Sequence, residues 1–202
     1  MKGSLENHWD YRVGVFSSDG NEELSEFDAG YFTLTSIGYD WAETLGVETA
    51  SLRLDYVYNQ RDENANTRDL SNVVTLAGKW EQGDWGLWTD LGSGRGYYGQ
   101  SDLWGLVLMP FYKVSGRVQL VGRYTYVESD EHNGLRLGRY ENAVVDGRGD
   151  EYQEVYLGVN LFFYGHKFKW QTGLQFSELI DDAEDGGRYD GWGITTGLRF
   201  SW

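Results

Sequence analysis

ASLRLDYVYN, residues 50–59, decides the fold class of this chain. Apolar and aromatic side chains occupy every second position of the stretch, and most of the positions between them are polar or charged. A period of two places successive side chains on opposite faces of a β-strand, whereas an α-helix repeats about every 3.6 residues. The same alternation recurs at 116–127, 167–177 and 190–202, and no helical period competes with it. The sequence therefore predicts an all-β protein.

The composition favours one β domain over 1–202 and excludes several other classes of protein. The chain has no cysteine, so it holds no disulfide framework, and its longest apolar runs fall far short of the roughly 20 residues of a spanning helix. Glycine is frequent (28 residues), proline occurs once and aromatic residues reach 16%, as expected for β-structure with aromatic girdles. The first eight residues lack the apolar core of a signal peptide, which predicts a mature or truncated form, or a protein that is not exported.

The alternation predicts ten strands, and the connections between them alternate in length. The strands are expected at 9–17, 29–40, 49–59, 72–81, 84–92, 102–112, 116–127, 152–164, 167–177 and 190–202. The segment 102–112 has the least certain register, because it is apolar on both faces and contains Pro110. Tight turns alternate with long polar loops, which places all the long loops at one end. Outer-membrane barrels have this asymmetry, with short periplasmic turns and long outer loops.

Charge and polarity follow the same division. The long loops and their borders hold seven Arg against 22 Asp and Glu, so they carry the whole net charge of −15. The apolar positions of the strands are rich in Leu, Val, Tyr and Trp, which predicts that this face of the sheet contacts lipid. The alternative is a water-soluble barrel with these residues inside. Rings near the strand ends would meet lipid headgroups: Trp9, Tyr11, Tyr39, Trp41, Trp80, Trp85, Tyr112, Trp170 and Trp202.

Several segments resemble the phosphate-selective porin O and P family. They are SDLWGLVLMPFY at 101–112, VQLVGRYTYVESDEHN at 118–133 followed by GLRL, GRGDEY at 147–152, VYLGVNLFFYGHK at 155–167 and QTGLQ at 171–175. The resemblance extends from about Trp9 to Trp202, with Trp202 where the family's closing strand more often has Phe. It implies a trimeric barrel of sixteen strands that passes small anions along basic side chains. This chain is shorter and resembles the C-terminal portion alone, which puts the pore diameter and the trimer in doubt. Ten strands closed alone would give a narrow lumen.

Basic residues at inward positions are the candidate pore lining: Arg12, Arg53, Lys79, Arg117, Arg123, Lys169 and Arg199. The arginine fork suits phosphate, and a ring of cations makes an anion-selective pore. The alternative is that these residues pair with Asp55, Asp90 and Glu154 and simply fill the lumen.

No catalytic residue, metal site or cofactor is predicted. His132 lies beside Asp130 and Glu131 and could act as a base, but no nucleophile accompanies it. Two acidic clusters, 62–69 and 181–185, favour loose divalent binding without a specific site. Nothing basic is contiguous, so nucleic acid is not an expected partner.

The sequence thus predicts a transmembrane antiparallel up-and-down β-barrel of the bacterial outer membrane, a porin that passes small solutes; a preference for anions such as phosphate is left open. Its expected partners are the lipid bilayer, lipopolysaccharide and the solutes, and a homo-oligomer is left open. The alternatives are a scaffold barrel or half-porin with a filled lumen, and an outer-membrane enzyme.

Overall fold

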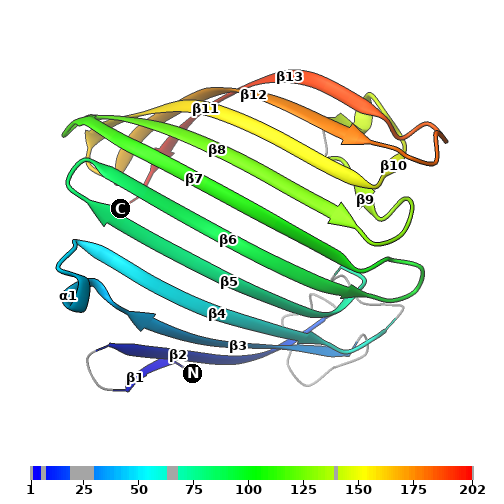
Figure 1. Ribbon diagram of the computed structural model, residues 1–202, viewed down its shortest axis with the longest axis horizontal. Helices are drawn as coiled ribbons and strands as arrows, with labels where there is room; N and C mark the ends of the chain where they lie inside the picture. The colour runs from blue at the N-terminus through cyan, green and yellow to red at the C-terminus, as the bar shows by residue number, and fades with distance from the viewer. Residues whose placement is uncertain (1, 6–7, 19–29, 63–67, 139–140, 202) are drawn as a thin grey trace.

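The computed structural model describes residues 2–5, 8–18, 30–62, 68–138 and 141–201. Ten long strands form one antiparallel sheet (Figure 1). They are β2 (Trp9–Ser17), β3 (Tyr31–Asp40), β4 (Thr49–Asn59), β5 (Leu70–Gln82), β6 (Trp85–Gly96), β7 (Leu103–Ser115), β8 (Val118–Ser129), β11 (Glu151–Tyr164), β12 (Phe168–Ile180) and β13 (Tyr189–Phe200). The short elements are β1 (Lys2–Leu5), α1 (Ala42–Leu45), β9 (Leu135–Arg136), η1 (Glu141–Ala143) and β10 (Arg148–Gly149).

The order of the strands in the sheet follows the chain, so the topology is up-and-down. The order is β1 to β8, then β11, β12 and β13, and β9 and β10 form a separate two-stranded ladder. All ten predicted strands are confirmed, and the main differences are extensions: β6 continues to Gly96 and β12 to Ile180. Cross-strand hydrogen bonds extend these strands beyond the point where the apolar alternation fades.

The tight connections lie at one end of the sheet, as predicted. Glycines in the left-handed conformation make three of them possible: Gly46 after α1, Gly83 between β5 and β6, and Gly165 between β11 and β12. Glycine suits these turns because a Cβ makes positive φ unfavourable. Among the described residues, no helix is long and apolar enough to cross a membrane.

The sheet is strongly curved (Figure 1). Its two faces differ in chemistry. Most of its exposed leucines and several exposed aromatic rings lie on the convex face, where Leu54 is 45% exposed, Leu157 67% and Phe200 60%. Most of the charged strand residues lie on the concave face, where Glu81 of β5 and Arg199 of β13 line one cavity. The alternative of a soluble barrel with the apolar set packed inside is therefore wrong.

The expected closure into a barrel is wrong for the described residues. In that part of the chain no pairing joins β13 to β1 or β2, so the sheet is open. The alternation of directions makes β13 antiparallel to β2 and hence parallel to β1. β1 pairs with the beginning of β2, from Trp9 to Arg12, and so occupies the edge on which β13 would have to close.

Pro110 lies inside the sheet, in β7, the segment with the least certain register. It is opposite Leu87 of β6, but the ladder to β8 passes from Leu108 directly to Phe111. Proline has no N–H to donate, which explains the gap. The strand assignment of 102–112 is confirmed despite the proline.

Candidate functional site

Six of the seven predicted pore-lining residues lie on the concave face. The register shows this, because directly opposed residues of an antiparallel pair point to the same face: Arg12 is opposite Ser36, which is opposite Asp55, and Lys169 is opposite Arg199. The residues on this face are Arg12, Arg53, Lys79, Arg123, Lys169 and Arg199. Arg117 instead lies in the turn between β7 and β8, because β8 begins only at Val118.

Two of these cations are neutralised by close carboxylates. Arg53 Nε lies 2.8 Å from an Asp55 oxygen, and Arg123 Nη2 lies 2.6 Å from Glu154 Oε1. Arg12 approaches Asp10 less closely, at 3.7 Å. The interpretation that ion pairs fill the interior is thus supported at Asp55 and Glu154.

Ser36 and Thr75 hold the Asp55 carboxylate from the neighbouring strands, since both hydroxyls donate hydrogen bonds to it. The Tyr152 hydroxyl donates to Glu154 Oε2 at 3.0 Å. Asp90, the third expected partner, forms no ion pair with a described residue.

Lys169 and Arg199 have a different environment. They are directly opposite each other on β12 and β13, and no carboxylate of the described residues lies within ion-pair distance of either. Lys169 Nζ lies 5.9 Å from the centre of the Phe162 ring. Like charges placed opposite each other in a sheet are unfavourable. An anion between these two side chains would relieve their repulsion.

A cavity of about 700 Å³ contains this cation pair. Its wall includes a row of amides in which Asn160 donates to Gln119 and Gln171 donates to Asn160, each at 2.8 Å. The lining residues are Glu81, Trp88, Met109, Phe111, Lys113, Gln119, Val121, Arg123, Tyr156, Asn160, His166, Lys169, Gln171, Gln175, Thr195 and Arg199. Cations and uncharged amides therefore outnumber carboxylates on this wall.

Sequence reasoning missed some of these residues. The predicted strand 102–112 ends before Lys113, but β7 continues to Ser115, so Lys113 faces the cavity and its Nζ lies 3.4 Å from Glu81 Oε2. If the period of two is extended through Lys113, it places this side chain on the concave face. The amide row has no signal in the sequence, because it requires the register of three strands.

The longest loop, between β8 and β11, folds onto the concave face at the long-loop end of the sheet. Its Leu135 and Leu137 are buried against Leu179 of β12. Tyr152 and Tyr189, which are on the concave face by register, pack against the same cluster. Figure 1 shows β9 and β10 at this end. The loop therefore covers part of the concave face at the long-loop end of the sheet.

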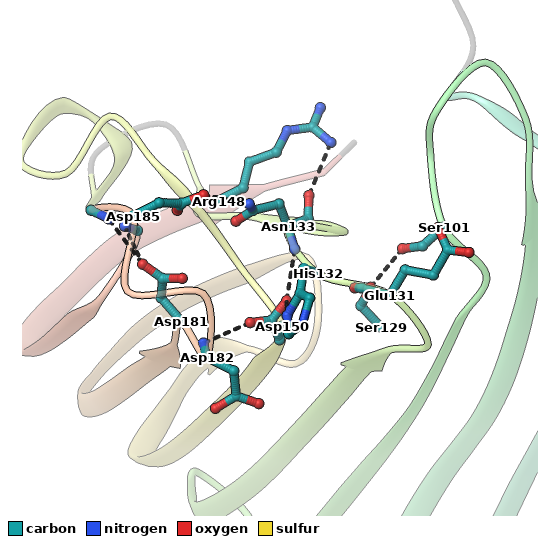
Figure 2. Close-up of polar contacts among 12 residues, drawn as sticks. Ser101, Ser129, Glu131, His132, Asn133, Arg148, Asp150, Asp181, Asp182 and Asp185 are labelled. Carbon is teal, nitrogen blue, oxygen red and sulfur yellow. Dashed lines mark hydrogen bonds and ion pairs between the residues drawn. The ribbon is translucent and has the colours of Figure 1, made fainter.

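Asp150 anchors this loop (Figure 2). It is buried, and its carboxylate accepts hydrogen bonds from the backbone N–H of Asn133 at 2.6 Å and of Asp182 at 2.7 Å. His132 Nδ1 lies 3.5 Å from the same carboxylate. Asp150 thus joins its own loop to the loop between β12 and β13.

Asp181 organises that second loop. Its Oδ2 accepts hydrogen bonds from the backbone N–H of Gly187 at 2.8 Å and of Gly186 at 3.0 Å (Figure 2). These bonds stabilise the charged form, so they lower the pKa of Asp181 from its ordinary value.

The loop geometry does not add evidence for catalysis or for a metal site. His132 is exposed, and the carboxylate beside it is already used by backbone N–H groups. Among the described residues, no group of three or more His, Cys, Asp or Glu could hold a metal ion. The cluster at 62–69 lies partly outside the described residues, because 63–67 are not among them. The absence of catalytic and metal sites stays a prediction.

No protein-family model matches the chain, and no curated protein is significantly similar to it.

Proposed function

We propose that this chain forms the wall of a bacterial outer-membrane β-barrel through which small solutes pass, with anions preferred. The convex face contacts the lipid bilayer and lipopolysaccharide, and the concave face lines the path of the solute. The observation that carries the proposal is the distribution of side chains: Leu54, Leu157 and Phe200 are exposed on the convex face, whereas Arg123 and Glu154 pair on the concave face. A face of exposed leucines and aromatic rings needs an apolar surrounding.

A membrane protein of this kind also needs its open edges paired. An unpaired strand edge in hydrocarbon leaves backbone N–H and C=O groups without partners, which is not viable. In the bilayer β13 must therefore pair with β2 after displacement of β1, or with strands of another chain. A homo-oligomer is one way to supply such strands.

The preference for anions rests on Lys169 and Arg199. They face the cavity without a carboxylate of the described residues within ion-pair distance, while Lys113 and Arg123 of the same wall are paired. Phosphate is a suitable solute because a guanidinium and an ammonium both donate to its oxygens. The resemblance to the phosphate-selective porin O and P family predicts the same solute, and it stays a prediction.

Conductance in planar bilayers tests the proposal. We expect current steps from the refolded protein and a reversal potential of the anion-selective sign in a salt gradient. The double variant Lys169→Gln/Arg199→Gln should lose most of this selectivity, while Arg95→Gln, on the convex face, should not change it. A cation-selective reversal potential in the original protein would contradict the anion preference.

The second candidate is a scaffold barrel with a filled lumen. The apolar cluster of Leu135, Leu137 and Leu179 favours it, because the inward-folded loop narrows the opening. This candidate predicts a folded protein in bilayers without current steps. Deletion of 135–148 would then restore conductance if the loop is the obstruction.

A further inference from the structure

A second cavity, of about 390 Å³, lies where three loops meet at the long-loop end. It shares no lining residue with the cavity that contains Lys169 and Arg199. Its lining residues are Arg68, Asp69, Leu70, Gln100, Leu103, Gly134, Leu135, Arg136, Leu137 and Arg148. The Gln100 side chain fixes the loops relative to each other by donating a hydrogen bond to the Gly134 carbonyl at 2.8 Å.

Two arginines of this cavity repel each other. Arg136 of β9 and Arg148 of β10 are directly opposite in the two-stranded ladder. Such a like-charge pair costs free energy unless an anion is shared between its members. A third arginine, Arg68, lines the same cavity and forms no ion pair with a described residue.

The existing contacts leave most of the donors of the pair unused. Arg136 Nη2 lies 3.6 Å from Asp146, whose side chain is 90% exposed, and its Nε donates to Asn142. Arg148 Nη1 donates to the backbone carbonyl of Asn133 at 3.3 Å, as Figure 2 shows. A guanidinium has five N–H donors, so both residues can still bind a carboxylate in the bidentate manner.

The remaining wall contains four leucines beside Asp69, Gln100 and Gly134. Leu135 and Leu137 are buried parts of it, and Leu70 and Leu103 are half-buried. Asp69 is the one carboxylate among the lining residues, against three arginines. The volume lies within the range of ordinary small-molecule pockets, about 300–1,000 Å³.

We propose that this cavity binds a small organic carboxylate with an apolar body. Arg136 and Arg148 bind the carboxylate group between them, with Arg68 as a further cation, and Leu70 and Leu103 contact the apolar body. An inorganic anion would satisfy the arginines but leave the accessible parts of Leu70 and Leu103 in contact with water. The site lies at the loop end and does not require that the barrel conducts ions.

Calorimetric titration of the full chain in detergent micelles tests the site, with benzoate as the probe. Heats from protein-free micelles are subtracted. We expect benzoate to bind at least tenfold more tightly than benzamide, which lacks the charge, and than acetate, which lacks the apolar body. The double variant Arg136→Gln/Arg148→Gln should bind benzoate at least tenfold more weakly than the original protein. Arg188→Gln, in the neighbouring loop and outside the lining, should leave it unchanged.

Two results would overturn the proposal. Equal affinity for benzoate and benzamide would exclude recognition by the arginines, and undiminished benzoate binding by the double variant would place the site elsewhere. Leu70→Ala keeps all three arginines and should lower the affinity for benzoate more than the affinity for acetate. This variant tests the apolar wall if the double variant does not fold. Conductance is measured separately, so a failure of this site and a failure of the proposed pore are distinguishable.

Discussion

Glu154 is buried on the concave face, where its carboxylate accepts hydrogen bonds from two neighbours. Arg123 and the Tyr152 hydroxyl donate to its two oxygens, and the side chain is only 9% exposed. Arg123 is more accessible, so water screens part of the attraction. The pair therefore holds β8 and β11 together without being a fully dry ion pair.

We expect Glu154→Gln to lower the free energy of unfolding by about 2 kcal/mol, because Arg123 would lose its charged partner on the concave face. Urea unfolding in micelles, followed by tryptophan fluorescence, measures this. Glu48→Gln, exposed just before β4, should change the value by less than about 0.5 kcal/mol. Equal values for the two variants would contradict a structural role of this pair.

Asp181 predicts a pH dependence of the loop between β12 and β13. Its pKa is lowered by hydrogen bonds from Gly187 and Gly186, so the carboxylate contributes stability above the pKa of the unfolded chain, about 4. This contribution is lost as the pH falls through the lower pKa of the folded state. We expect the amide NMR shifts of Gly186 and Gly187 to titrate below about pH 4 and to stop titrating in Asp181→Asn. A midpoint above pH 5 would contradict the lowered pKa.

At the scale of elements, β11 and β12 are shaped around one aromatic ring. Gly158 and Gly173 are directly opposite each other, and the Tyr156 ring lies over both on the concave face. A Cβ added to Gly173 would lie 2.4 Å from Tyr156 Cζ. Both glycines are therefore required by the position of the ring, since neither has a positive φ.

We expect Gly173→Val to destabilise the protein by about 1–3 kcal/mol, because the valine must displace the Tyr156 ring. Gly197→Val is the matched control: it is on the concave face of β13, and a Cβ there meets nothing within 4 Å. Thermal unfolding of the two variants in micelles separates them. If both lost the same stability, β propensity or backbone freedom, and not the ring, would be the cause.

At the scale of the whole molecule, the curved sheet separates a convex apolar face from a concave polar face. Leu157 lies near the middle of β11 on the convex face and is 67% exposed. If the proposed membrane location is right, this position is near the centre of the bilayer. In water the same position would tolerate a charge.

We expect Leu157→Arg to lower the stability of the protein folded in lipid bilayers by about 2–4 kcal/mol, the cost of an arginine near the midplane. Gly197→Arg, on the concave face and with open space around it, should cost much less. Denaturant unfolding from lipid vesicles measures both. A neutral Leu157→Arg would show that the convex face does not contact hydrocarbon.

Much of the sheet could be predicted because strand periodicity is a local property. The segment 49–59 was predicted with the observed boundaries of β4, and the faces of Arg53 and Asp55 followed from their parity. The predicted strand 116–127 includes Arg117, but Gly116 and Arg117 form the two-residue turn that precedes β8. No local sequence pattern predicts that the loop with Leu135 and Leu137 folds inward, because this depends on their contact with Leu179 of β12.

Local sequence patterns are enough to predict an antiparallel sheet of ten long strands and the side chains that share a face, because the period of two depends only on neighbouring residues. Three features are visible only in the folded chain: among the described residues the sheet is open, Arg123 has a carboxylate partner while Lys169 and Arg199 have none, and Arg136 lies opposite Arg148. These features depend on register and on contacts between residues far apart in the chain, which local patterns do not specify.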